Sequence, residues 1–496
     1  MKNNFKKFLF IGLAASSALL TSCKKDYLDT TPTEYVDENI LFNDMKGAWA
    51  AINGIHRAMY SAYDSQDQTG QSSVMIDADM MGEDIVMTSA GNGWWNASYQ
   101  WTMHRNVNAT QLRFVYSFYY KVIRNANLIL QKIDAVPGDA TERNAIKGQA
   151  YAYRAWAHFN LVQLFGGRYD AAGTNGQDGV VLALKAEATP KPQARATVAE
   201  VYTQVNKDLD SAFANLPATS RNTKSHFNGM VVTGLKARVA LTQQNWQVAA
   251  DLAGQVIAGS GTSLMSQIQY GQGFNSVENP EWIWGSYQVD DQTTAFNGFF
   301  AYMSANYNST NIRQNPKAIN STLYKKFPAT DIRTKLWDPT GASTPIPPKG
   351  SRFPYINQKF LAKSSGSSVG DVVYMRLAEM YYIQAEAYAM LNQDAQAANA
   401  LFTVVSARNT AYTKSTNTGT ALRTEISDNR RFELWGEGFR FFDLKRKNEA
   451  MDRSGTNFNL ALSVITGIPA GDKQWQWLIP QDEINAGGGL IKQNPL

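Results

Sequence analysis

Apolar residues recur at three- and four-residue steps along much of the chain, which is the spacing of amphipathic α-helices. Near the start, Ala48, Ile52, Ile55 and Met59 fall on one helical face. The same spacing predicts helices over 45–63, 110–136, 141–165, 197–216, 228–243 and 245–258. Glycine or proline follows several of these segments, as at Gly166, and such residues commonly end a helix. The pattern therefore indicates a mostly α-helical chain.

Two pairs of helical segments have the small-residue and aromatic spacing of tetratricopeptide hairpins. The first pair joins 234–241 to 245–250, and the second joins 372–391 to 394–409. Small residues at the contact let two antiparallel helices approach closely. The chain has no strict repeat of about 34 residues, so the sequence predicts a helical scaffold rather than a regular solenoid.

Three long stretches lack helical spacing and are rich in Gly, Asn, Ser or Pro. They run over about 65–105, 260–370 and 450–496. Irregular segments of this length usually carry function, because binding residues concentrate on loops that a rigid scaffold holds. The predicted fold is mostly α: a tetratricopeptide-like helical-hairpin scaffold with a large irregular portion and a few short strands. We expect 45–496 to form a single domain.

Residues 1–22 have the features of a secretory signal peptide. Basic residues precede the apolar run 8–20, which is too short to cross a hydrocarbon core about 30 Å thick. The exit, 20–23, resembles a lipobox, and Cys23 is the only cysteine in the sequence, so it cannot form an internal disulfide. We therefore predict lipidation of Cys23 and a lipidated tether over 23–44. The alternative is a buried N-terminal helix with an incidental cysteine.

Composition gives little support to nucleic-acid, metal or cofactor binding. The net charge is a modest +5 and the basic residues do not form runs. The four histidines lack the spacing of metal ligands, and no Gly-rich phosphate loop follows a strand. A nucleophile motif is also absent from the sequence. We therefore expect no metal, no cofactor and no catalytic residue.

Six landmarks occur in order along nearly the whole chain. They are Cys23 with 26–29 and Pro32, then 148–167, 279–284, 374–387, 430–446, and finally 477–480 with 493–495. On these landmarks the chain resembles the SusD/RagB family, the surface nutrient-capture lipoproteins of glycan-using Gram-negative bacteria. The family usually has a proline soon after the turn that ends at Gly167, where this chain has Arg168 and Tyr169.

The resemblance implies a non-catalytic protein that is lipid-anchored to the outer membrane and faces the cell surface. It would bind an oligosaccharide or polysaccharide and deliver it to a SusC-like TonB-dependent transporter. Three alternatives remain open: the same architecture could bind peptides, the protein could be a glycoside hydrolase, or it could be a structural partner of the transporter without a ligand site.

Charged residues crowd the landmark 430–446, which invites an active-site interpretation. Glu433 and Glu437 are four residues apart and would be neighbours on one helical turn if the helix continues. A pair of carboxylates can hydrolyse a glycoside, but nearby arginines would depress their pKa and remove the general acid. We therefore predict a packed helix end with paired charges. Glu379 and Glu386, with Arg376, should similarly dock helices.

An aromatic stretch at 91–101 is the stronger candidate for binding. Indole rings stack on the C–H faces of sugars, while amides form hydrogen bonds with sugar hydroxyls. The candidate ligand-binding residues here are Trp94, Trp95, Asn96, Tyr99 and Trp101. A second candidate surface contains Phe299, Phe300 and Tyr302. In both places the alternative is that the rings pack inside the protein and brace the loop.

Overall fold

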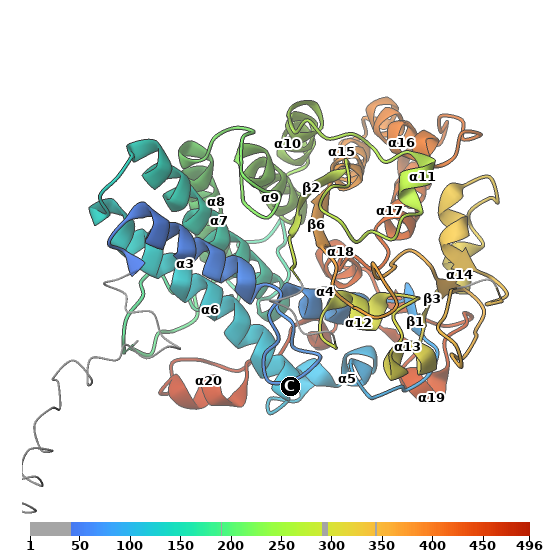
Figure 1. Cartoon of the computed structure of the whole chain (residues 1–496), viewed down its shortest axis with the longest axis horizontal. Coiled ribbons are helices and arrows are strands. Elements are labelled where there is room, and N and C mark those ends of the chain that lie inside the picture. The colour runs from blue at the N-terminus through green and yellow to red at the C-terminus, as the bar shows by residue number, and fades with distance from the viewer. Residues whose placement is uncertain (1–40, 190, 290–295, 343–344) are drawn as a thin grey trace, which may run out of the picture.

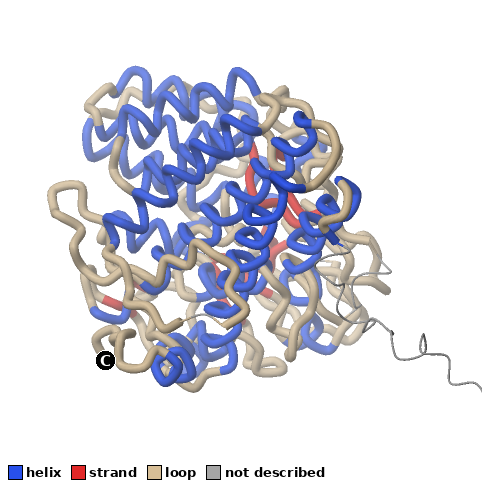
Figure 2. Tube along the Cα trace, turned by 90° about the vertical axis from the view of Figure 1, so that its left-hand side faces the viewer, coloured by secondary structure: helices blue, strands red, loops and turns tan. Residues whose placement is uncertain are grey.

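The computed structural model describes residues 41–189, 191–289, 296–342 and 345–496 (Figure 1). The predicted signal peptide, Cys23 and most of the predicted tether lie outside these residues. Helices dominate the described part and the strands are short (Figure 2). The predicted fold class, mostly α with a large irregular portion, is confirmed.

Eight helices form most of the scaffold. They are α6 (Thr110–Lys132), α7 (Ala140–Phe165), α8 (Val198–Asn215), α9 (Gly229–Thr242), α10 (Trp246–Gly259), α15 (Leu377–Met390), α16 (Asp394–Arg408) and α17 (Gly419–Glu433). Consecutive helices pack as pairs, and α10 packs against α15 although more than a hundred residues separate them. In addition, α3 (Met45–Ala58) lies across α6 and α7. Its first turn is capped by Asp44, which accepts a hydrogen bond from the backbone N–H of Gly47 at 2.8 Å.

Small residues explain how these helices approach one another. Gly234 of α9 has no space for a larger side chain, since a Cβ atom there would lie 2.4 Å from the sulfur of Met375. On α10, Ala249, Ala250 and Ala253 are fully buried. Gly234 thus brings α9 close to β6, while on α10 a Cβ atom at Gly259 would lie 2.9 Å from the sulfur of Met230 of α9.

Short strands tie the irregular stretches together. A four-stranded sheet has the order β1 (Ile85–Met87), β3 (Lys317–Ile319), β5 (Ile356–Asn357) and β4 (Trp337–Asp338). β2 (Trp282–Ser286) pairs antiparallel with β6 (Val372–Arg376), and β7 (Met451–Asp452) pairs with β8 (Gly467–Ile468). In the first sheet Ile85 lies opposite Ile319, which brings the first irregular stretch beside the second.

Short helices occur in the irregular portion and, in the case of α18, just before its last stretch. They are α5 (Asn96–Tyr99), α11 (Gln267–Tyr270), α12 (Phe299–Met303), α13 (Thr310–Gln314), α14 (Ser321–Tyr324), α18 (Arg440–Lys447), α19 (Leu460–Ser463) and α20 (Gln481–Ala486). Single 3₁₀ turns are η3 (Met103–Arg105), η4 (Ile133–Ala135), η5 (Ile332–Leu336) and η6 (Lys473–Trp475). In Figure 1, α5, α12, α13 and α19 gather at one end of the molecule, around β1 and β3.

Two elements differ from the sequence prediction. The stretch predicted as irregular over 65–105 contains α4 (Gln71–Met80), which is buried on nearly every side. A helix surrounded by protein has no polar face, so its sequence lacks the alternation that marks an amphipathic helix. The segment 372–391, predicted as one helix, begins instead with strand β6 and turns into α15 at Leu377.

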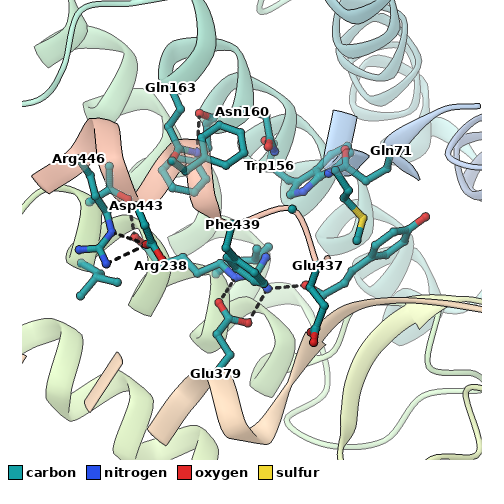
Figure 3. Close-up of a pocket in the computed structure, with 18 of the residues that line it drawn as sticks. Gln71, Trp156, Asn160, Gln163, Arg238, Glu379, Glu437, Phe439, Asp443 and Arg446 are labelled. Carbon is teal, nitrogen blue, oxygen red and sulfur yellow. Dashed lines mark hydrogen bonds and ion pairs between the residues drawn. The ribbon is translucent and has the colours of Figure 1, made fainter. Parts of the chain in front are cut away.

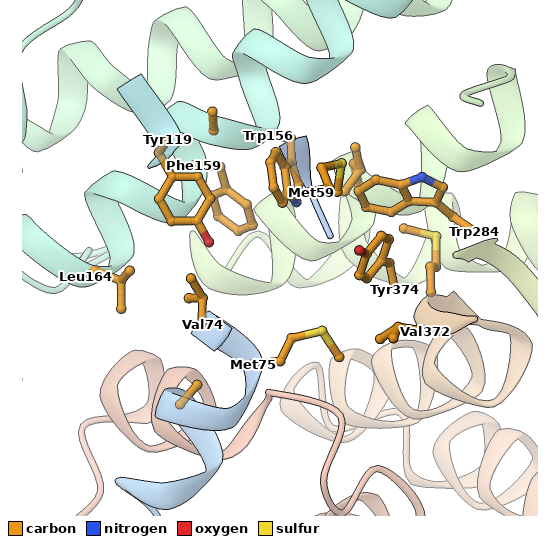
Figure 4. Packing of buried hydrophobic residues seen from close by; sticks show 14 of the residues in the cluster. Met59, Val74, Met75, Tyr119, Trp156, Phe159, Leu164, Trp284, Val372 and Tyr374 are labelled. Carbon is orange, nitrogen blue, oxygen red and sulfur yellow. The ribbon is translucent and has the colours of Figure 1, made fainter. Parts of the chain in front are cut away.

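One large hydrophobic cluster joins the scaffold to the irregular portion. Figure 4 shows its centre, where Trp156 of α7, Trp284 of β2 and Tyr374 of β6 lie close together. The ring centroids of Trp284 and Tyr374 are 4.9 Å apart, and those of Trp156 and Trp284 are 5.9 Å apart. The loops are therefore held on the same core as the helical hairpins.

Candidate ligand-binding site

The candidate binding loop, residues 88–101, begins after β1 and is fastened to the segment that precedes β3. The Thr88 hydroxyl donates to the Pro316 carbonyl at 2.8 Å, and the Ser89 hydroxyl donates to the Gln314 carbonyl at 2.7 Å. The side-chain oxygen of Asn315 accepts the backbone N–H groups of both Thr88 and Ser89. These bonds pre-organise the loop, which lowers the entropic cost of binding a ligand there.

Trp94 is the one predicted aromatic ligand residue that keeps part of its surface exposed. Its carbonyl accepts a hydrogen bond from the Tyr302 hydroxyl at 3.2 Å, and the exposed residues Asn92 and Gly93 precede it. Asn96 is also partly exposed, but its amide donates to the Ala90 carbonyl at 3.1 Å and so braces the loop. Ligand contact by Trp94 stays a prediction, now with a surface that a ligand can reach.

The other three rings of the loop point into the protein. Trp95 has a left-handed backbone conformation, with φ of 57°, and its ring lies 4.3 Å from that of Tyr302. Tyr99 stacks on Phe458, and the indole N–H of Trp101 donates to the Met81 carbonyl at 2.9 Å. A buried ring offers no face to a sugar, so in this conformation these side chains support the loop, which is the alternative stated above.

The second predicted surface is likewise turned inward. Phe299, Phe300 and Tyr302 of α12 are all buried, and the Lys317 ammonium lies 3.8 Å from the centre of the Tyr302 ring. Phe300 fills the space beside Gly370, where a Cβ atom would lie 2.6 Å from its ring. As placed, this segment is a support under the loop rather than an open binding surface.

Two exposed rings occur elsewhere in the irregular portion: one begins the second aromatic stretch, and the other follows β2. Phe296 is 63% exposed just before α12, and Tyr287 is 53% exposed just after β2. Two aliphatic side chains near α5 are exposed as well: Leu460 by 57% and Val464 by 58%. This segment is joined to the binding loop by a hydrogen bond from the Gln100 amide to the Leu462 carbonyl. The sequence offered no signal for Tyr287 because a single aromatic residue after an apolar strand is usually core.

The carboxylates of the landmark 430–446 lie in buried ion pairs. The Glu433 carboxylate forms ion pairs with three guanidinium groups, those of Arg376 at 2.7 Å, Arg408 at 3.0 Å and Arg333 at 3.3 Å. The Glu437 carboxylate forms ion pairs with the Arg376 guanidinium at 2.8 Å and with the Lys359 ammonium at 2.6 Å. We call this set, together with Glu281 and Asp331, the buried charge cluster.

The helix does not continue through this landmark. α17 ends at Glu433, and Gly436 and Gly438 adopt φ values of +76° and +85° before α18 begins. Glu433 and Glu437 therefore do not share a helical turn, because the helix that this arrangement required is absent. The two carboxylates nevertheless meet because both bind Arg376.

Glu379 and Glu386 dock helices, as predicted, but not through Arg376. Glu379 of α15 pairs with Arg238 of α9 at 2.6 Å, and Glu386 of α15 pairs with Arg446 of α18 at 2.6 Å. Figure 3 shows Arg238 facing Glu379 beside a cavity of about 80 Å³. That volume is well below the size of ordinary ligand pockets.

The electrostatics of these groups disfavour acid catalysis. Burial alone raises the pKa of Glu433, but Arg408, Arg376 and Arg333 outweigh it and hold the pKa below its usual range. The pKa of Glu437 is likewise lowered: burial opposes the shift, and Arg376 and Lys359 produce it. A general acid needs a raised pKa, so these two carboxylates are suited to ion pairing.

Within the described ranges, no group of three or more His, Cys, Asp or Glu residues is arranged to hold a metal ion. None of the helices in the same ranges is long and apolar enough to cross a membrane.

Comparisons with known proteins agree with the landmarks in the sequence. A family model described as starch-binding and associating with the outer membrane matches residues 26–241, and the model of the SusD family matches residues 245–496. The "SusD-like protein P38" of Formosa agariphila is 25% identical over 384 residues, which covers 68% of this chain and 72% of that protein.

Solved structures show the same fold. The crystal structure of a SusD-like carbohydrate binding protein from Bacteroides vulgatus is 25% identical with a TM-score of 0.78, and the match covers 90% of this chain and 97% of that one. A SusD superfamily protein from Bacteroides thetaiotaomicron is 26% identical with a TM-score of 0.77, covering 91% and 100%. The resemblance seen in the sequence is confirmed: the chain belongs to the SusD family.

Proposed function

We propose that this protein captures an oligosaccharide or polysaccharide at the cell surface without cleaving it. In this proposal it hands the glycan to a SusC-like TonB-dependent transporter in the outer membrane. The observation that carries the proposal is membership of the SusD family, because one matching family model is described as starch-binding. A structural relative at 25% identity is itself named a carbohydrate binding protein.

The partly exposed residue Trp94 supplies the physical basis for binding. An indole face packs against the C–H face of a pyranose, and exposed amides such as that of Asn92 form hydrogen bonds with hydroxyl groups. Pairs of aromatic rings contribute about 0.5–1.5 kcal/mol beyond the area they bury, and we take the same magnitude for an indole on a sugar ring. Such modest binding suits a protein that must release its ligand to a transporter.

The proposal also assigns a role to the N-terminal segment. Lipid on Cys23 would hold the protein at the outer membrane, and the polar segment 24–32 would let the body move while staying beside its transporter. Phe42 already packs against the hydrophobic core just before α3, so the predicted tether would end close to this helix.

Affinity electrophoresis against a panel of neutral and acidic polysaccharides, with calorimetry against a peptide digest, tests the proposal. We expect retention by at least one polysaccharide, and Trp94→Ala should weaken it about fivefold to tenfold, the effect of losing about 1–1.4 kcal/mol. Trp246→Ala is the matched control, since Trp246 is also partly exposed but belongs to α10 of the scaffold. It should leave retention unchanged.

Three results would contradict parts of this proposal. Unchanged retention of the Trp94→Ala variant would remove the proposed site. Binding to the peptide digest alone would replace the glycan with a peptide as the ligand. Release of sugars from a polysaccharide by the wild type, lost on Glu437→Gln in a protein that remains folded, would favour a glycoside hydrolase.

A further inference from the structure

A second cavity lies apart from the binding loop and shares no residue with it. Its volume is about 260 Å³, and its walls come from the end of α3, the middle of α7, the turn 223–226, β2 and β6. Figure 4 shows part of the inner wall, where Met59, Trp284 and Tyr374 lie against one another. Tyr287, which is 53% exposed, also lines the cavity and so connects it to the surface.

The lining combines apolar faces with several polar groups. Of the described residues that form it, none is Asp, Glu, Lys or Arg. The hydrogen-bonding groups are instead the Asn53 amide, the hydroxyls of Thr223, Ser225 and Ser286, and the imidazoles of His56 and His226, besides several phenols. A cavity of this kind favours a neutral ligand, because none of the side chains that line it carries a charge to offset the lost hydration of a buried ion.

Four lining residues have buried polar atoms without a hydrogen-bond partner. They are Nε2 of His56, Nδ1 of His226 and the hydroxyls of Tyr153 and Tyr374. The two imidazole rings are 4.4 Å apart and nearly perpendicular, and the rings of His56 and Tyr153 are 5.4 Å apart. Buried polar groups normally have partners, so this concentration around one cavity indicates a place for an occupant that forms hydrogen bonds.

Both histidines are neutral under ordinary conditions. Burial, aided by Arg221, lowers the pKa of His226 to about 4, and burial beside His226 lowers the pKa of His56 well below its usual value. A neutral imidazole presents one nitrogen lone pair and one N–H group. A ligand with several hydroxyl groups can both donate to the lone pairs and accept from N–H and phenol groups.

Aromatic faces and size narrow the ligand further. Trp284, Tyr374 and the half-exposed Tyr287 provide rings against which C–H groups can pack. At about 30 Å³ for each water in the liquid, the cavity has the volume of roughly nine water molecules. This is space for one sugar ring rather than for a chain.

We propose that this cavity is a second saccharide subsite, which takes a single neutral pyranose unit. The inference rests on the proposed glycan-binding function and adds a place of binding distinct from Trp94. Its hydrogen bonds would come from His56, His226 and Tyr153, and its entrance would lie between Asn53 and Tyr287.

The test uses the full chain and three free sugars: D-glucose, D-galactose and D-mannose. Each sugar is titrated to tens of millimolar, and saturation-transfer NMR detects its binding. We expect at least one sugar to bind. Tyr153→Phe, which removes only the unpartnered hydroxyl, should weaken binding about fivefold, the effect of one hydrogen bond. Asn53→Trp changes an exposed residue at the rim and should abolish binding. Tyr388→Phe, outside the cavity, should bind like the wild type.

Absence of binding by all three sugars, or equal binding by the wild type and both cavity variants, would overturn the inference. Binding of Zn²⁺ that depends on both histidines, with no sugar bound, would also overturn it in favour of a metal site. Affinity electrophoresis of the same proteins separates this failure from that of the main proposal. Polysaccharide retention without monosaccharide binding would overturn only the second subsite, whereas loss of both would overturn both.

Discussion

Replacing Glu433 with glutamine removes one negative charge from the buried charge cluster without changing the shape of the side chain. The cluster balances four cations against four carboxylates. Its members are Arg333, Lys359, Arg376, Arg408, Glu281, Asp331, Glu433 and Glu437. All of them are nearly or completely inaccessible to solvent. Glu433→Gln therefore leaves an excess positive charge in the interior.

The expected cost follows from the contacts that Glu433 makes. Its carboxylate accepts hydrogen bonds from Arg376, Arg408 and Arg333, at distances of 2.7 to 3.4 Å. Hydrogen bonds to charged groups contribute about 1.5–3 kcal/mol each, so even the lower value gives about 4.5 kcal/mol for three partners. Removing one partner of a buried ion pair typically costs about 3–5 kcal/mol, which agrees. We expect the free energy of unfolding to fall by that amount at pH 7.

Urea unfolding followed by tryptophan fluorescence measures the loss. The matched control is Asp482→Asn, the same carboxylate-to-amide change in an ion pair with Arg113 whose side chains are 67% and 54% exposed. Exposed pairs contribute about 0–1 kcal/mol, so this variant should resemble the wild type. A loss for Glu433→Gln no larger than that of the control would refute the electrostatic reasoning, because the charge would then be compensated by something other than these arginines.

Two further predictions concern a turn and a titration. Gly438→Ala should cost about 2 kcal/mol or more, since its φ is +85° and a Cβ atom would lie 2.8 Å from backbone of α4. Gly261→Ala, with φ of +68° and open space around it, should cost only about 1 kcal/mol in urea unfolding, and equal losses would contradict the packing argument. Burial lowers the pKa of His104 to about 3, below its unfolded value, so its contribution to stability is complete above pH 6.5 and is lost as pH falls toward 3. Lowering the pH from 7 to 5 should therefore reduce the free energy of unfolding of the wild type by about 2 kcal/mol more than that of a His104→Gln variant. Parallel pH profiles of the two proteins would contradict this prediction. Asp77 and Asp79, with pKa values raised to about 7 chiefly by burial, titrate in the opposite sense but equally in both proteins.

Periodicity predicted the scaffold well wherever a helix has one buried and one exposed face. The segment predicted over 110–136 contains α6 (Thr110–Lys132), and the one predicted over 197–216 is α8 (Val198–Asn215). It failed for α4, which is buried all round and interrupted by polar residues such as Asp77 and Asp79. It also failed at β6, because a short apolar run has the same composition in a buried strand as in a buried helix.

The sequence alone determined the fold class and the family, because these depend on patterns that span a few neighbouring residues and on landmarks in a fixed order. Only the tertiary structure decided which rings face solvent. Trp94 and Trp95 are identical neighbours, yet Trp95 is buried because Tyr302, far along the chain, packs against it. Likewise, Glu433 is held by arginines from three separate segments, and His56 meets His226 across one cavity. Such meetings depend on long-range packing, which local propensity and charge spacing do not encode.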